Sequence, residues 1–259
     1  MTDLFFPAFD GEIIDRGEYL VIRTPLNPDF YWGNFLFFMH PPAEGDHSRW
    51  QDLFSREIGN PPKVIHNVFG WDSPNGELGS VEQFVQKGFR LNQNVVLESS
   101  QPNSPPNTSL EVEIRTLTID SDWVQALDNQ KACWPESSEN PEHLSFMARQ
   151  MNRYRCMTDS GLGDWYGAFL DDRLVADLGV FHNHEIGRFQ MVETHPDFRR
   201  RGIAGKLVVE AGRQALEKFG LRKLVIVAEE NSGAQRLYQS LGFIPVEKQV
   251  GLEWWPDLK

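Results

Sequence analysis

The chain has 259 residues, 40% of them hydrophobic, so it can bury a substantial core. Its formal net charge of −12 argues against extended contact with nucleic acid or an anionic membrane, because such contacts need positive surface charge. No stretch approaches about 18 uninterrupted apolar residues and the first residues, MTDLFFPAFDGE, lack a basic leader, so we expect a cytoplasmic protein. The two cysteines, Cys133 and Cys156, lack metal-ligand spacing, and we expect no metal.

Along the first part of the chain, the patterns predict a strand over residues 32–38, a helix over 48–59 and a strand over 63–69. Residues 99–109, SSQPNSPPNTS, contain three prolines and no aliphatic or aromatic residue, which is typical of an extended linker. We therefore divide the chain into a first domain (residues 1–98), a linker (99–109) and a second domain (110–259).

Two segments recur on both sides of this linker in the same order. VIRTPLNPDF (21–30) resembles EIRTLTIDSDW (113–123), and FVQKGFRLNQNVVLE (84–98) resembles YQSLGFIPVEKQVGLE (238–253). This order predicts an internal duplication with a shortened first copy. Where the second copy has RRRG, the first has PPAEGD, whose prolines lack amide hydrogens and whose Glu44 and Asp46 repel anions.

The second part predicts a mixed α/β order. A strand at VEIRTL is followed by two helices, a hairpin of WYGAFL and RLVADLGVF, and a strand at IGRFQMVET. An amphipathic helix over residues 203–219, ended by Gly220, precedes a buried strand at KLVIVA. A further helix, SGAQRLYQSLG, then leads to a hairpin-like pair of strands in FIPVEKQVGLEW.

The turn HPDFRRRGIAGKL has the features of an anion site. The first amides of a helix have no partner within it and carry about half a positive charge, so an anion is stabilised there. Gly202, Ala204 and Gly205 leave room for a phosphate to approach the backbone. Three consecutive arginines, Arg199, Arg200 and Arg201, would add charge-assisted hydrogen bonds.

The order of elements, the turn RRRGIA and the downstream NSGAQRLYQSLGF together resemble the GNAT superfamily of acyl-CoA-dependent N-acetyltransferases. The matching residues are Arg199, Gly202 and Ala204 in the turn and Asn231, Ala234, Tyr238, Gly242 and Phe243 downstream. The resemblance implies an α/β fold with a central, mostly antiparallel sheet, helices on both faces and a shortened second copy at the N-terminus.

The resemblance also implies that acetyl-CoA is the acyl donor and that its pantetheine arm inserts between the strands at residues 186–194 and 224–228. The residues that would bind it are Val192, Thr194, Arg199, Arg200, Arg201, Gly202, Ile203, Ala204, Gly205, Asn231 and Ala234. Asn231 has a second possible role, as the cap of the following helix.

A small-molecule primary amine would then attack the thioester directly in a ternary complex. Tyr238 matches the family's general acid, although a tyrosine beside a Gly-Phe turn is also an ordinary core residue; the equivalent residue in the first copy is Phe84. Glu193 is the preferred general base, with Glu185, His195 or water as alternatives.

Five residues near the acceptor side could shape an aromatic pocket for a substrate cation, although core packing explains most of them more simply. They are Trp123, Cys133, Trp134, Trp165 and Tyr166.

Two classes of function remain open. The first is an N-acetyltransferase, and the alternative is a non-catalytic acyl-CoA-binding or partner-binding module. Retention of Tyr238 as well as the turn favours the enzyme, because a binding module needs only the turn. The sequence does not indicate the acceptor, an acyl group other than acetyl, the role of the first domain or the oligomeric state.

Overall fold

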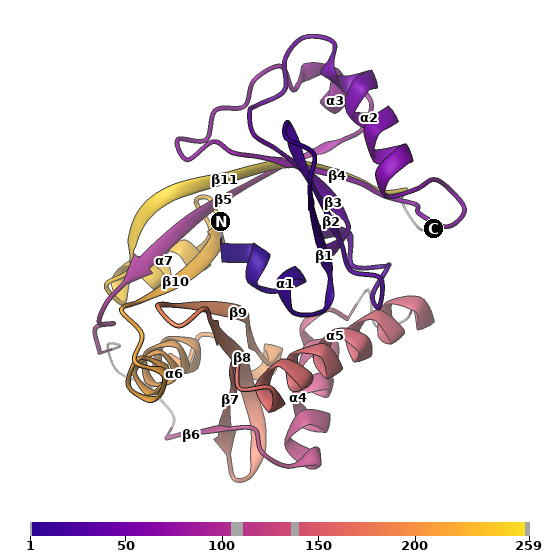
Figure 1. Cartoon of the computed structure of the whole chain (residues 1–259). Helices are drawn as coiled ribbons and strands as arrows, with labels where there is room; N and C mark the ends of the chain where they lie inside the picture. Colours follow the sequence, from indigo (N-terminus) through magenta and orange to yellow (C-terminus); the bar gives the residue numbers. More distant parts are fainter. Residues whose placement is uncertain (1, 105–110, 136–139, 257–259) are drawn as a thin grey trace.

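A computed structural model describes residues 2–104, 111–135 and 140–256, and it contains one sheet of 11 strands. The strand order is β1-β2-β3-β4-β11-β5-β10-β9-β8-β7-β6, with parallel pairing in β3–β4 and β9–β10 and antiparallel pairing elsewhere (Figure 1). The predicted α/β class with a mostly antiparallel sheet is confirmed.

The strands of the first half (residues 2–104) are β1 (Glu12–Asp15), β2 (Tyr19–Arg23), β3 (Phe35–Phe38), β4 (Asn67–Trp71) and β5 (Arg90–Ser99). The strands of the second half (residues 111–256) are β6 (Glu113–Thr116), β7 (Gly163–Leu170), β8 (Arg173–His182), β9 (Ile186–Thr194), β10 (Lys223–Glu229) and β11 (Ile244–Trp254).

The α-helices are α1 (Pro7–Asp10), α2 (Asp46–Glu57), α3 (Glu82–Gln86), α4 (Asp120–Cys133), α5 (Pro141–Asp159), α6 (Ile203–Phe219) and α7 (Gly233–Ser240). Short 3-10 turns are η1 (Thr2–Phe5), η2 (Tyr31–Gly33) and η4 (Pro196–Phe198). None of the helices in the described part of the chain is both long enough and apolar enough to cross a membrane.

Helices cover both faces of the sheet in the second half. α6 and α7 share a core with Tyr166 and Val180 on one face. α4 and α5 share a core with Trp165 and Phe181 on the other. Because successive residues of a strand point to opposite faces, the neighbouring Trp165 and Tyr166 belong to different cores.

The two halves exchange their last strands. β5 lies between β10 and β11, and β11 lies between β5 and β4. We expected a pair of strands at the end of the second half, but the structure has a single strand, Ile244–Trp254, with an irregularity between Pro245 and Glu247. A second strand is not needed there because β5, from the first half, supplies the antiparallel partner (Figure 1).

The same order of elements runs through β3, α2, β4, α3 and β5 and again through β9, α6, β10, α7 and β11. After α3 and α7 the chain turns alike: φ is +89° at Gly88 and +87° at Gly242. In the first half the Phe89 amide donates to the Phe84 carbonyl at 3.0 Å, and in the second half the Phe243 amide donates to the Tyr238 carbonyl at 3.1 Å. Phe84 therefore occupies the position equivalent to Tyr238, as predicted.

The other two similar segments, residues 21–30 and 113–123, do not occupy equivalent positions in the fold. Residues 21–23 lie in β2, between β1 and β3, whereas residues 113–116 form β6 at the edge of the sheet. By its place next to the first parallel strand, β2 corresponds to β8. The shared Ile-Arg-Thr is therefore a coincidence of sequence.

The beginning of the predicted linker contacts the second half. The Asn103 amide donates to the Leu241 carbonyl at 2.8 Å, and Arg213 Nη2 lies 3.2 Å from Ser104 Oγ. Residues 105–109 of the predicted linker lie outside the described residues. The division into two domains at this linker remains a prediction.

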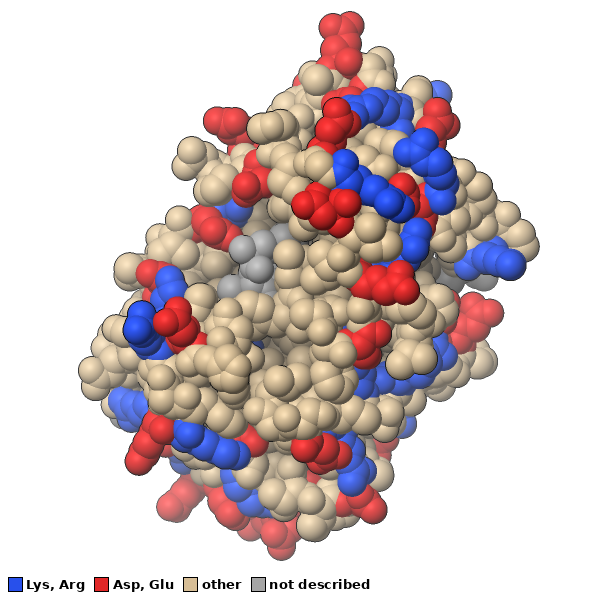
Figure 2. All heavy atoms as spheres, viewed as in Figure 1, with Lys and Arg blue, Asp and Glu red and all other residues tan. Residues whose placement is uncertain are grey.

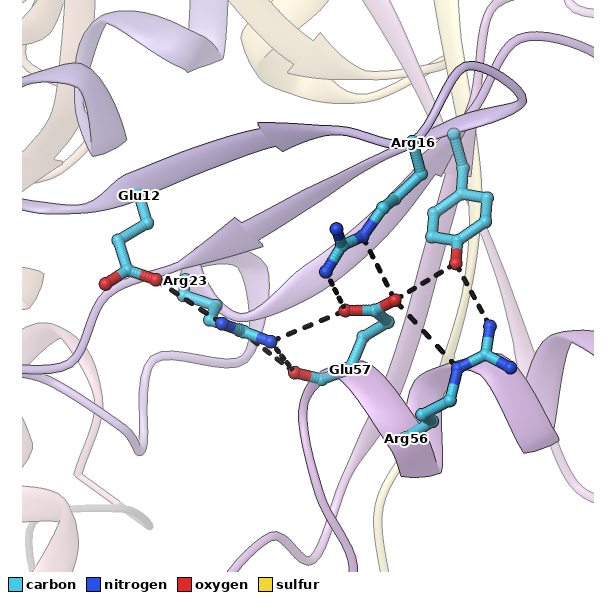
Figure 3. A network of polar contacts seen from close by, with 6 residues as sticks. Glu12, Arg16, Arg23, Arg56 and Glu57 are labelled. Carbon is cyan, nitrogen blue, oxygen red and sulfur yellow. Dashed lines mark hydrogen bonds and ion pairs between the residues drawn. The ribbon is translucent and has the colours of Figure 1, made fainter.

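A network around Glu57 fixes the C-terminal end of α2 to the first two strands (Figure 3). Arg16 Nη2 lies 2.9 Å from Glu57 Oε2, Arg23 Nε donates to the Glu57 carbonyl at 2.9 Å, and the Tyr19 hydroxyl bonds Glu57 Oε1 at 3.2 Å. Cations are favoured here because a helix C-terminus carries partial negative charge. The bond from Arg16 holds the pKa of the Glu57 carboxyl below its ordinary value, although burial opposes this.

Candidate active site

β9 and β10 separate partway along their length. Their parallel pairing ends at the third pair, Arg188 opposite Val225, although β9 continues to Thr194 and β10 to Glu229. The facing edges of the two strands are not joined beyond this point. This is the separation that the resemblance implied.

A β-bulge lies in the separated part of β9. Gly179 of β8 pairs with Gln190, but Asp177 pairs with Glu193, so β9 carries one extra residue between the two pairs. Met191, within this extra length, has a left-handed φ of +48°. A bulge of this kind changes the direction of the side chains that follow it.

Val192 and Thr194, the two strand residues predicted to contact the cofactor, lie on this separated part of β9. Val192 packs against the core beneath α6. The Thr194 carbonyl accepts a hydrogen bond from Arg199 Nε at 3.0 Å, which ties the end of the strand to the following turn. Arg199 therefore has a structural role in addition to its charge.

Left-handed backbone at two positions shapes the turn before α6. φ is +63° at Arg200 and +80° at Gly202, which is the N-cap residue of α6, and no side chain caps the helix there. The helix begins at Ile203, Ala204 is half-buried and Gly205 is buried, so small side chains surround the first amides. Amides at the start of a helix favour an anion, and phosphate binding at this turn remains a prediction.

The three arginines of the turn are all exposed. The Arg201 guanidinium lies 5.4 Å from the centroid of the Phe198 ring. Together with Arg199 and Arg200 it places three positive charges beside the N-terminus of α6, where the helix dipole already favours an anion.

Asn231 does not cap α7, because Ser232 does: Ser232 Oγ accepts from the Gln235 amide at 3.1 Å. Asn231 is exposed, has a left-handed φ of +63°, and its amide donates to Gln235 Oε1 at 2.6 Å. Ala234 is exposed in the first turn of α7. The alternative role of Asn231 as a cap is therefore wrong, and cofactor contact by Asn231 and Ala234 remains a prediction.

Tyr238 lies in α7 with only 5% of its surface exposed, in the core that α7 shares with α6. Burial raises the pKa of its phenol and the charge of Glu193 raises it further, whereas the charge of Arg188 lowers it. A phenol of raised pKa stays protonated at neutral pH. Such a group can donate a proton to a departing thiolate.

Glu193 lies at the end of β9 against α4. Its Oε1 accepts a hydrogen bond from Trp134 Nε1 at 3.2 Å, and burial raises the pKa of its carboxyl. Burial also raises the pKa of the Cys133 thiol to about 12, so this cysteine is not a nucleophile at neutral pH. A carboxylate of raised pKa is suited to accept a proton near neutral pH.

Asp177 faces Glu193 from β8 and is fully buried. It accepts hydrogen bonds from Asn129 Nδ2 at 3.2 Å and Gln130 Nε2 at 2.7 Å. Burial raises the pKa of Asp177 to about 8, and the charge of Glu193 adds to this effect. Two facing carboxyls resist simultaneous ionisation, so the pair retains a proton at neutral pH. Sequence reasoning missed Asp177, whose only signal is a carboxylate inside the apolar run VADLGV.

The two alternative bases do not face this pair. Glu185 lies before the start of β9, far along the strand from the turn, in an ion pair with Arg222 at 3.2 Å. His195 Nδ1 accepts from the Asp197 amide at 3.3 Å and caps the short helix η4.

A cavity of about 340 Å³ lies between the two halves, on the face of the sheet covered by α4 and α5. Its second-half walls include Arg188 and Gln190 of β9, Val227 of β10 and Tyr154 of α5. The rest comes largely from the first half and the exchanged strands: Phe6, Pro7, Phe30, Trp32, Phe35, Phe37, Gly70, Trp71, Asp72, Ser73, Pro74, Asn92, Asn94, Glu247, Lys248, Gln249 and Val250. α1 lies between the upper and lower parts of the molecule in Figure 1, where Phe6 and Pro7 reach this cavity.

A chain of hydrogen bonds joins the two halves beside the cavity. Gln190 Nε2 and Gln150 Nε2 both donate to the Tyr154 hydroxyl, at 2.8 and 2.7 Å. Gln150 Oε1 accepts from Asn27 Nδ2 at 2.9 Å. The bonds connect the separated strand β9, through α5, to the loop after β2.

None of the five residues considered for an aromatic pocket lines this cavity. Trp123 and Trp165 pack in the core beneath α4 and α5, with ring centroids 6.1 Å apart. Tyr166 lies on the opposite face and donates to Asp164 Oδ2 at 3.3 Å. Core packing therefore explains Trp123, Trp165 and Tyr166, whereas Trp134 is exposed. The aromatic residues of the cavity come mainly from the first half.

On the face shown in Figure 2, positive and negative side chains are mixed over the upper and lower parts, and the band between them is largely uncharged. Within the described ranges, no group of three or more His, Cys, Asp or Glu side chains is placed to hold a metal ion.

Residues 123–243 match the model of the acetyltransferase (GNAT) family. The match lies in the C-terminal half, spans slightly less than half of the chain, and agrees with the GNAT-like fold of that half. A search of curated proteins finds no significant match.

Solved structures extend the similarity of fold to the whole chain. A functionally unknown conserved protein from Staphylococcus epidermidis aligns with a TM-score of 0.74 at 14% identity over 97% of this chain and 96% of that one. A GCN5-related N-acetyltransferase from Kribbella flavida gives 0.64 at 14% identity, over 97% and 92%. A tandem GNAT protein from the clavulanic acid biosynthesis pathway gives 0.54 at 12% identity, over 82% and 69%.

Proposed function

We propose that the chain is an acetyl-CoA-dependent N-acetyltransferase that acts on a primary amine of a small molecule. The observation that carries this proposal is the separation of β9 from β10, with the anion-binding turn and α6 on one face of the sheet and the cavity on the other. An extended thioester arm that passes between the two strands would connect the turn to the cavity.

The turn would hold the pyrophosphate of the donor. The amides that begin at Ile203 would donate to phosphate oxygens, and Arg200 and Arg201 would add positive charge from the exposed side. Gly202 and Gly205 allow the close approach of the phosphates that this contact needs.

In the transfer, the amine nitrogen attacks the thioester carbonyl carbon, so an N–C bond forms as the C–S bond breaks. Tyr238 gives its phenolic proton to the departing thiolate. The proton lost by the amine passes through water to Glu193, which does not itself line the cavity. Burial raises the pKa of the Glu193 carboxyl, which suits this group to accept the proton near neutral pH.

The test measures thiol release from acetyl-CoA across a panel of primary amines, with Tyr238→Phe as the comparison and the change in melting temperature with acetyl-CoA as a separate measure of binding. An amine that stimulates release in the wild type, with a large loss in the variant, supports the proposal. A rise in melting temperature with acetyl-CoA but no release with any amine would identify the chain as a binding module instead.

A further inference from the structure

Seven of the residues that line the cavity are aromatic and nine are polar or charged. Phe6 comes from the N-terminal segment, Phe35 and Phe37 come from β3, and Tyr154 comes from α5. Phe35 and Phe37 point into the cavity because the alternate residues of β3 face the core beneath α2. Where these rings line the cavity they favour a flat apolar body, and a volume of about 340 Å³ limits the occupant to a small molecule.

The outer part of the cavity is negatively charged. Asp72 is exposed and Glu247 is half-buried, and neither takes part in an ion pair with any residue that the structure describes. The nearby cation, Lys248, lies 2.7 Å from Glu230. Two uncompensated carboxylates attract a cationic amine and repel a carboxylate.

The inner part has the opposite charge. Arg188 is only 7% exposed and belongs to the last pair before β9 and β10 separate. Burial raises the pKa of the phenols of Tyr154 and Tyr238, on opposite faces of the sheet, and the charge of Arg188 opposes part of this rise in both. A positive charge at this point disfavours an ammonium group and favours the neutral amine that attacks the thioester.

From these features we infer that the acceptor is a small aromatic primary amine without a carboxylate, drawn in by Asp72 and Glu247, enclosed by the rings of the first half, and neutral where it meets Arg188. The inference rests on the proposed function, because it treats the cavity as the acceptor side of that reaction.

Both binding and turnover are measured on the full chain with three probes: 2-phenylethylamine, phenylalanine and glucosamine. We expect calorimetry to give a dissociation constant for 2-phenylethylamine at least tenfold below those of the other two. Thiol release should give a kcat/KM at least 100-fold higher. Preference for phenylalanine would assign Arg188 to a substrate carboxylate, and preference for glucosamine would make the aromatic walls irrelevant; either result overturns the inference.

The charge of the outer part is tested with the double substitution Asp72→Asn and Glu247→Gln. We expect about tenfold weaker binding of 2-phenylethylamine. The matched control is Asp52→Asn with Glu82→Gln, which removes two exposed carboxylates of the first half that do not line the cavity. Equal effects of the two pairs would overturn the role given to Asp72 and Glu247.

The role of Arg188 is tested with Arg188→Gln by a pH profile. We expect kcat/KM for 2-phenylethylamine to fall at least tenfold at pH 7 and to recover towards the wild-type value at pH 9, where more of the amine is neutral. A loss that is equal at both pH values would contradict this role. This variant keeps the charged and titratable groups that line the cavity with Arg188, which are Tyr154, Asp72, Glu247 and Lys248, and it keeps Tyr238, on which the charge of Arg188 also acts.

The experiments distinguish failure of the proposed acetyltransferase activity from failure of the inferred acceptor class. If 2-phenylethylamine binds as expected but releases no thiol, the ligand class stands and the acetyltransferase proposal fails. If another amine is acetylated while 2-phenylethylamine neither binds nor reacts, the acetyltransferase proposal stands and the ligand class fails.

Discussion

The chain contains the same turn and helix twice, and the two copies differ in charge far more than in backbone. Gly45 before α2 and Gly202 before α6 are both N-cap residues, with φ of +88° and +80°, and neither supplies a side-chain cap. In the first copy Asp46 begins the helix, and its carboxylate accepts from the Ala43 amide at 2.8 Å. A bound anion would meet this carboxylate, whereas at α6 it would meet three arginines.

The strands behind these turns differ as well. β3 and β4 remain paired at Phe38 opposite Trp71, and the Asp72 amide continues the pairing to the Phe38 carbonyl at 2.9 Å. Trp50 of α2 stacks on Phe38 with ring centroids 3.7 Å apart. The first copy therefore has no gap for a thioester arm, and the opposite face of its closed strands forms a wall of the cavity.

The largest expected effect comes from placing a carboxylate in the turn before α6. Gly202→Glu should weaken acetyl-CoA binding at least 100-fold in calorimetry, because it puts a negative charge beside the phosphates. Gly45→Glu is the matched control, since it imposes the same left-handed strain before the other helix and should leave the affinity unchanged. Similar losses in both variants would mean that strain, not the site, is responsible.

The next largest effect concerns the hydroxyl of Tyr238, whose equivalent in the first copy is Phe84. Tyr238→Phe should lower kcat about 100-fold and leave acetyl-CoA affinity unchanged, because general acid catalysis contributes roughly 10²–10⁴-fold. Tyr166→Phe removes another buried hydroxyl from the same core and should leave kcat near that of the wild type. A Tyr238→Phe enzyme with full activity would remove this residue from the mechanism.

A third change tests whether Glu57 contributes to stability alone and not to acetyl-CoA binding. Glu57→Gln should lower the free energy of unfolding by about 1–3 kcal/mol, the usual cost of breaking bonds to a charged group, without changing acetyl-CoA affinity. Since the folded-state pKa of Glu57 is lowered, its contribution exists above the unfolded pKa and is lost as pH falls. Urea unfolding should show that the difference in unfolding free energy between the wild type and Glu57→Gln is smaller at pH 3 than at pH 7. An equal difference at both pH values would contradict a stabilising role for the charge of Glu57.

The last effect changes only the pH dependence of stability and concerns the carboxyl pair, which has no counterpart in the first copy, where β2 and β3 pair Tyr19 with Phe38 and Leu20 with Phe37. The folded-state pKa of Asp177 is raised to about 8, so the stability linked to it is present at low pH and is lost as pH rises towards 8. One proton limits this slope to about 1.4 kcal/mol per pH unit. Asp177→Asn should flatten the unfolding free energy between pH 5 and 8, and an unchanged slope would refute the assignment.

The features that depend on local sequence were predictable. The turn before α6 follows from Gly202 and the stripe of apolar residues after it, and the Gly-Phe turns after α3 and α7 follow from residues adjacent in the chain. The family resemblance rests on the same local features. Equivalence of Phe84 and Tyr238 was therefore available from the sequence alone.

The features that depend on pairing between distant segments were not predictable. The sequences of β5 and β11 are those of ordinary strands, and nothing in them indicates that each strand will lie beside the other half. The cavity was missed for the same reason, because Phe35, Phe37 and Tyr154 meet only after this exchange. The facing of Asp177 and Glu193 likewise depends on the register of β8 with β9, including one extra residue in β9.

The most direct test of the central claim, that the second copy alone receives the donor and passes it through the sheet, is a crystal structure of the protein with acetyl-CoA. The account predicts the pyrophosphate at the amides that begin at Ile203 and the thioester between β9 and β10, emerging beside Gln190 and Val227 into the cavity. A donor bound against α2, or a thioester held outside the separated strands, would contradict it.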